Sequence, residues 1–123
     1  TSALAFGGFI PPVTGATEEY NGTSWATSAG SLNTARQDLA AAGTQTAALA
    51  FGGKTPRTGA TEEYDGTSWA NNPTGLNTAR SEFTGCGTQT VALAFGGYTG
   101  TVNTGATEEW TGAGPVTKTI TAS

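Results

Sequence analysis

The chain has 123 residues and a net charge of −4, and only 11% of its residues are charged, against about 25% in ordinary soluble domains. The acidic balance excludes the basic surface that nucleic acids or anionic membranes need, and no apolar run approaches the roughly 20 residues of a spanning helix. With no histidine and one cysteine, the usual general base and an internal disulfide framework are both missing. We therefore predict a non-enzyme with no catalytic residue, no metal, no cofactor, and no nucleic-acid or membrane partner.

Short words recur along the chain at a fixed spacing. ALAFGG begins at residues 3, 48 and 92, so that successive starts lie 45 and 44 residues apart. TGATEEY (TGATEEW in the third copy), GTSWA, LNTAR and GTQT follow it in that order. A period of this size predicts a repeat protein, and the abundance of glycine and threonine favours a turn-rich β fold.

Four short strands are predicted in each period, called a to d. In chain order they cover residues 36–43, 45–53, 59–64 and about 67–70. Strand b is apolar on both faces, which indicates that both are covered, and a glycine doublet ends it. Strands c and d are joined by Asp65-Gly66, the preferred pair for a type I′ hairpin.

Strand a has a competing interpretation as a short helix over residues 33–43, ended by a glycine. The second copy favours a strand, because Thr84-Gly85 replaces two alanines and both residue types are poor helix formers. The whole pattern predicts an all-β fold built from four-stranded antiparallel blades of a β-propeller. We expect a single repeat domain with a partial blade at about 1–31 and blades at about 32–75 and 76–123.

The repeat resembles the kelch repeat, in which a strand ends in Gly-Gly, a tyrosine and a tryptophan follow, and an arginine opens the next blade. The first two copies have that order, whereas the third has Trp110 but replaces GTSWA with GPVTKTITAS. The motif comprises Gly7, Gly8, Tyr20, Trp25, Arg36, Gly52, Gly53, Tyr64, Trp69, Arg80, Gly96, Gly97 and Trp110. The near-verbatim copies are also similar to kelch-like repeat proteins of bacteriophages and environmental bacteria. The resemblance implies a kelch-like β-propeller, of which this chain contains fewer than three blades.

An incomplete set of blades leaves open edges and apolar faces, which is an aggregation hazard. We expect the ring to be completed either by the remaining repeats of a longer chain or by copies of this chain in a homo-oligomer. Of the two, the longer chain is favoured, because a dimer would still lack two inner strands.

Three glutamate pairs, at 18–19, 62–63 and 108–109, are the obvious catalytic candidates. Neighbouring residues on a strand point to opposite faces, so one pair cannot form a two-carboxylate site. We expect one glutamate of a pair to hold Arg36 or Arg80 in a blade-to-blade ion pair and the other to face solvent. The aromatic residues are expected to pack between sheets, and Cys86, which replaces an alanine of the earlier copy, to be a packed interior residue.

Two connections vary between copies while the rest hardly changes. The b–c bridge reads FIPPV, KTPR and YTGTVN, and the stretch after the tryptophan reads TSAGS or NNPTG. Both connections emerge on the same face of a propeller, and variable loops on a rigid scaffold are where binding usually occurs, although exposed loops also drift. The candidate ligand-binding residues are Phe9, Ile10, Lys54, Arg57, Asn71, Asn72 and Tyr98.

These observations predict a non-catalytic binding or structural module of the phage tail-fibre or secreted adhesin type. Such a module is extracellular or part of a virion, and it presents its loops to a glycan or a cell-surface ligand. The alternative is a lectin-like homo-oligomer that assembles a propeller from identical chains. A kelch-type oxidase is disfavoured, because those enzymes use copper with histidine and tyrosine ligands and this chain has no histidine.

Overall fold

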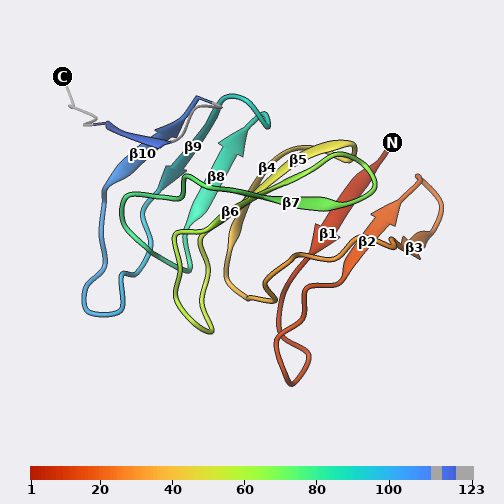
Figure 1. The fold of residues 1–123 in the computed structure, drawn as a ribbon, viewed down its shortest axis with the longest axis horizontal. Coiled ribbons are helices and arrows are strands. Elements are labelled where there is room, and N and C mark those ends of the chain that lie inside the picture. The colour runs from red at the N-terminus through yellow and green to blue at the C-terminus, as the bar shows by residue number, and fades with distance from the viewer. Residues whose placement is uncertain (112–114, 119–123) are drawn as a thin grey trace.

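The computed structural model describes residues 1–111 and 115–118, and every regular element within them is a β-strand. The strands form three antiparallel sheets that lie side by side (Figure 1). The first sheet contains β1 (Ala3–Phe6), β2 (Thr17–Tyr20) and β3 (Trp25–Thr27). The second contains β4 (Ala40–Thr44), β5 (Ala47–Phe51), β6 (Thr61–Tyr64) and β7 (Trp69–Asn72). The third contains β8 (Thr84–Gly87), β9 (Ala92–Phe95), β10 (Thr107–Trp110) and β11 (Pro115–Lys118).

The predicted all-β fold is confirmed, and so is the order of strands. Each four-stranded sheet follows the chain from a to d, and the first sheet has only b, c and d. The segment that replaces GTSWA in the third copy supplies β11 as the fourth strand. The end of the third predicted blade, residues 119–123, lies outside the described residues.

Strand a begins later than predicted. β4 starts at Ala40 and β8 at Thr84, so the arginine and the three residues after it belong to the connection. The helical alternative for residues 33–43 is excluded. Strand a starts late because Asp38 and Glu82 adopt positive φ values of 55° and 57°, which an extended strand does not allow.

The c–d hairpin also differs from its prediction. Tyr64 pairs with Trp69, so the loop has four residues between them and not two. Only Gly66 has a positive φ, whereas a type I′ turn needs two such residues. The Asp65 carboxylate instead accepts hydrogen bonds from the backbone N–H groups of Thr67 and Ser68, both at 2.8 Å, and this local bonding sets the turn.

The core consists of two layers, each between neighbouring sheets. Alternation along β5 sends Ala48 and Ala50 toward the first sheet and Leu49 and Phe51 toward the third. The first layer joins the two alanines to Tyr64, Trp69 and Leu32, with Leu4, Phe6 and Leu39 packed against them. The second layer joins Leu49 and Phe51 to Ala40, Ala92, Ala94 and Trp110. Strand b is therefore covered on both faces in the second sheet, as its sequence predicts.

The glycine doublets are required for two reasons. Gly52 and Gly53 have φ values of 68° and 108°, which L side chains rarely adopt. A Cβ on Gly53 would also lie 2.9 Å from the Gln37 carbonyl oxygen. Backbone conformation and close approach together explain why the doublet recurs at the end of each strand b.

Two packing predictions are wrong at the ends of the stack of sheets. Trp25 is 51% exposed, whereas Trp69, its equivalent in the second sheet, is 5% exposed. Cys86 is exposed, whereas Ala42 at the equivalent position is partly buried against the second core layer. The cause is the same in both cases, because within the described part of the chain neither outer face has a neighbouring sheet to cover it.

Candidate binding site: the loop face

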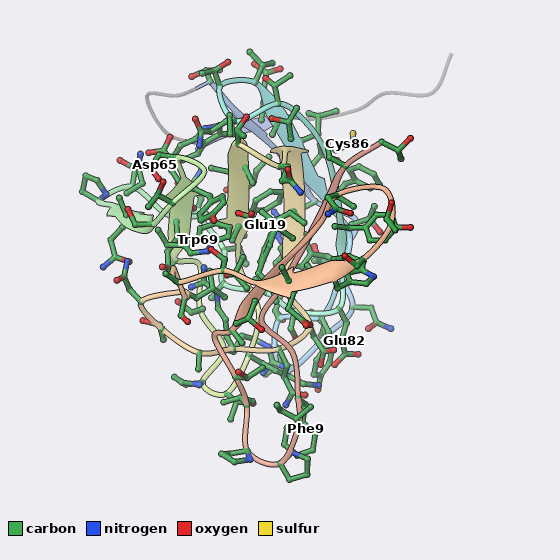
Figure 2. All side chains as sticks on the ribbon, turned by 90° about the vertical axis from the view of Figure 1, so that its right-hand side faces the viewer. Phe9, Glu19, Asp65, Trp69, Glu82 and Cys86 are labelled. Atoms are coloured by element: carbon green, nitrogen blue, oxygen red, sulfur yellow. The ribbon has the colours of Figure 1, made fainter. Side chains whose placement is uncertain are left out.

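All b–c and d–a connections emerge at one end of the sheets, which we call the loop face. It comprises residues 7–16, 28–39, 52–60, 73–83 and 96–106. The three b–c loops project together at the lower edge of Figure 1, and Figure 2 shows Phe9 at that end and Asp65 and Cys86 at the other. The expectation that both kinds of variable connection share one face is confirmed by the strand order.

The b–c loops differ in sequence but share one set of backbone anchors. The first glycine of each doublet donates to an alanine carbonyl across the loop, and a threonine N–H donates back to the second glycine. The first set is Gly7 to Ala16, Gly52 to Ala60 and Gly96 to Ala106, and the second is Thr14 to Gly8, Thr58 to Gly53 and Thr104 to Gly97, at 2.9–3.2 Å. The recurring residues therefore hold the base of each loop and leave its tip free to vary.

Below the loops, one arginine connects each pair of neighbouring sheets. Gly8 N–H donates to the Arg36 carbonyl and Gly53 N–H to the Arg80 carbonyl, each at 2.8 Å. The Arg36 guanidinium reaches Glu62 of β6 at 3.4 Å, and Arg80 pairs with Glu108 of β10. The backbone of each arginine thus bonds to one sheet and its side chain to the next. The predicted pairing of each arginine with a glutamate is confirmed, but the two partners lie in the same predicted blade, so the contact between blades is made by the arginine backbone and not by the ion pair.

The buried carboxylate also organises the connection in front of strand a. Glu62 accepts hydrogen bonds from the N–H groups of Asn33 (2.6 Å) and Thr34 (3.4 Å), and Glu108 does the same for Asn77 and Thr78. Burial lowers the pKa of Arg36, and the charge of Glu62 opposes that effect. These groups are bonded to the scaffold and face the interior, which supports a structural role.

The second glutamate of each pair does not face open solvent as expected. Glu63 is half-buried and accepts from the Asn72 amide at 3.2 Å. Glu19 accepts from the Tyr64 hydroxyl at 2.7 Å and so joins the first sheet to the second. In the first copy the exposed member is Glu18, because strand a and its arginine are missing there.

The loop face carries a small cluster of charges around Lys54. Its ammonium lies 3.0 Å from Asp38 and 2.7 Å from Glu82, which follow the arginines of two successive connections. The hydrogen bond to Glu82 and then the one to Asp38 raise the pKa of Lys54. Glu82 N–H also donates to the Asp38 carbonyl at 3.0 Å, so the two connections are joined directly.

A second cluster lies beside the first and uses the third b–c loop. The Arg57 guanidinium lies 5.0 Å from the centre of the Tyr98 ring, a cation–π geometry. Arg57 also donates two hydrogen bonds to the Ser81 hydroxyl, at 3.1 and 3.3 Å. Ser81 precedes Glu82, so the two clusters form one continuous patch of guanidinium, ammonium, carboxylate and aromatic groups.

The structure therefore brings together three of the seven candidate residues, Lys54, Arg57 and Tyr98. Phe9 and Ile10 are exposed at the tip of the first b–c loop and share no hydrogen bond, ion pair or ring contact with the patch among the described residues. Asn71 and Asn72 lie within β7 and not in a loop. The Asn72 side chain is already bonded to Glu63 and to Thr74 N–H, and Asn71 is exposed.

Sequence reasoning missed Asp38, Ser81 and Glu82. It assigned them to strand a, although the two copies differ at this point, reading QD after one arginine and SE after the other. This difference, directly after the LNTAR motif, was the sequence signal for a loop. Asp38, Thr55 and Glu82 all have positive φ (55°, 79° and 57°), and strained backbone of this kind concentrates at functional sites.

The described residues give no indication of a metal or membrane site. They contain no group of three or more metal-ligating side chains and no helix long and apolar enough to cross a membrane. Two hollows lie away from the loop face: one of about 220 Å³ between β1 and β4, and one of about 260 Å³ on the outer face of the third sheet.

Comparison with known proteins adds no identification. No protein-family model matches the chain, and no curated protein matches it.

Proposed function

We propose that this chain is a non-catalytic binding module with a kelch-like propeller architecture, and that its loop face contacts a glycan or another surface ligand. The observation that carries the proposal is a patch of five polar or aromatic side chains that four connections bring together on a constant scaffold. The five are Asp38, Lys54, Arg57, Glu82 and Tyr98. Carboxylates and cations hydrogen-bond to hydroxyls, and an aromatic ring stacks on a sugar face.

The contrast between a constant scaffold and variable loop tips supports the same role. Each b–c loop has the same backbone anchors, while its tip differs in length and chemistry from copy to copy. Functional side chains are typically presented on loops that a rigid scaffold positions. This role is of the tail-fibre or secreted-adhesin type, and the proposal therefore includes a location on a virion or outside the cell.

The test is a glycan array probed with the protein and with three variants. We expect Arg57→Ala and Tyr98→Ala to lose at least tenfold in affinity, because each removes one partner of the cation–π pair. Thr67→Ala, in an exposed c–d turn at the opposite end, is the matched control and should bind like the unchanged protein. Binding that survives both loop variants would reject the loop face as the site, and an array without any signal would favour a purely structural module.

A second candidate is a lectin-like homo-oligomer built from identical chains. The observation in its favour is that the two outer sheet faces carry the residues that meet inside the molecule.

A further inference from the structure

The two outer faces of the stack of sheets differ in composition and are complementary to each other. The leading face, on the first sheet, presents Ala3, Ala5, Tyr20 and Trp25, since Leu4 and Phe6 point the other way into the first core layer. The trailing face, on the third sheet, presents Leu93, Phe95 and Glu109 by the same alternation, and Thr107 lies on the same side but is only 5% exposed. Neither face is covered by another sheet among the residues that the structure describes.

The junction between the first and second sheets shows what each face binds. There, Ala48, Ala50, Tyr64 and Trp69 of the second sheet pack on Leu4, Phe6, Thr17 and Glu19 of the first. The first four residues are identical in type and register to the leading face, and the other four are identical to the trailing face.

The chemistry of this junction is specific. Trp69 Nε1–H donates to Thr17 Oγ1 at 2.9 Å, and Phe6 packs edge-on against the Trp69 ring with centroids 4.6 Å apart. On the leading face, Tyr20 and Trp25 already hold the arrangement of Tyr64 and Trp69, with centroid distances of 5.1 and 4.9 Å. The leading face is thus preformed for a surface that offers an exposed phenylalanine, as the trailing face does with Phe95.

Exposure shows how much apolar surface remains to be covered. Trp25 is 51% exposed against 5% for Trp69, and Phe95 is 38% exposed against 3% for Phe51. The trailing face also has the hollow of about 260 Å³ lined by Leu93, Val91 and Cys86. Uncovered apolar faces of this kind mark interaction surfaces.

We propose that the leading face of a second copy of this chain docks on the trailing face, so that identical chains associate head to tail. The second copy's Trp25 ring packs on Phe95, as Trp69 packs on Phe6 at the internal junction. Because the two faces differ, the contact is heterologous and continues until the ring closes. The first sheet has no strand a, so this junction lacks the contacts that β4 and β8 make and is weaker than the internal ones.

The test uses the whole chain in sedimentation velocity between about 1 and about 200 µM, with no ligand present, so that its outcome is independent of the proposed binding role. We expect the mean mass to rise reversibly with concentration. Trp25→Glu and Phe95→Glu should each remain monomeric, and both positions are exposed, so folding is preserved. Val102→Glu, at an exposed loop residue off both faces, is the control that should assemble normally.

Mixing the two defective variants identifies the mode of contact. Trp25→Glu keeps an intact trailing face and Phe95→Glu an intact leading face, so an equimolar mixture should form a one-to-one dimer that grows no further. A chain that stays monomeric at the highest concentration, a mixture that stays monomeric, or assembly of Phe95→Glu alone would overturn the proposal; the last would indicate leading-to-leading contact.

Discussion

The two internal junctions are made of the same repeated words, yet they satisfy their polar groups differently. At the first junction Trp69 donates to Thr17, whereas at the second the equivalent Thr61 hydroxyl is buried with no hydrogen-bond partner in the part of the chain that the structure describes. The cause is that the third copy lacks the GTSWA tryptophan, and Trp110 donates to the Gln89 carbonyl instead.

For the arginines, the second junction is the one with the better satisfied polar groups. Arg80 donates to the carbonyls of Gly96 (3.1 Å) and Ala106 (2.7 Å) and to Glu108. Three nitrogens of Arg36 have no hydrogen-bond partner among the described residues, and only its ion pair with Glu62 at 3.4 Å remains. The repeat therefore determines which residues meet, while the two junctions differ in how many of the arginine's nitrogens find a hydrogen-bond acceptor.

The largest expected effect comes from the arginines. Arg80→Met should lower the free energy of unfolding by about 3–5 kcal/mol, because it leaves the Glu108 carboxylate buried without a counter-charge. Arg36→Met should cost clearly less, because it also removes three buried nitrogens that lack partners. Urea midpoints of both variants check this. Adding Glu108→Gln to Arg80→Met should recover part of the loss, and equal losses for the two arginines would contradict the contrast.

Substitutions of Thr17 and Thr61 should change the free energy of unfolding less, and in opposite directions. Thr17→Val should cost about 1–3 kcal/mol, because it leaves the buried Trp69 N–H without an acceptor. Thr61→Val keeps the shape of the side chain and removes an unbonded hydroxyl, so it should be neutral or stabilise by about 1 kcal/mol. Thermal and urea unfolding measure both. A loss at Thr61 as large as that at Thr17 would show that Thr61 has a partner after all.

The smallest effect concerns the c–d turns and appears only in acid. The hydrogen bonds from the N–H groups of Ser68 and Thr67 lower the pKa of Asp65, so its contribution is present at neutral pH and is lost as the pH falls below about 4. Asn21 makes the same two bonds in the first sheet without a charge. Asp65→Asn should therefore match the unchanged protein at pH 7 and lose less stability between pH 5 and pH 2.5. An identical acid dependence of the urea midpoint would exclude this role.

Much of the scaffold could be predicted because it depends on local rules. Alternation along ALAFGG placed strand b, the glycine doublet marked its end, and the need to pair a buried charge indicated that a glutamate would bind Arg36 and Arg80. The start of strand a was harder, because the positive φ of Asp38 and Glu82 has no sequence signal as strong as a glycine. The patch around Lys54 was missed for the same reason.

The sequence by itself determined the period, the order of strands and the alternation of side chains along each strand, because alternation and turn chemistry act within a few residues. Only the tertiary structure decided which copies of a repeated residue are buried. Trp25 and Trp69, Cys86 and Ala42, and Glu18 and Glu62 occupy equivalent positions, and each pair differs in exposure. The physical reason is that burial depends on whether another sheet lies against that face, which no local pattern records.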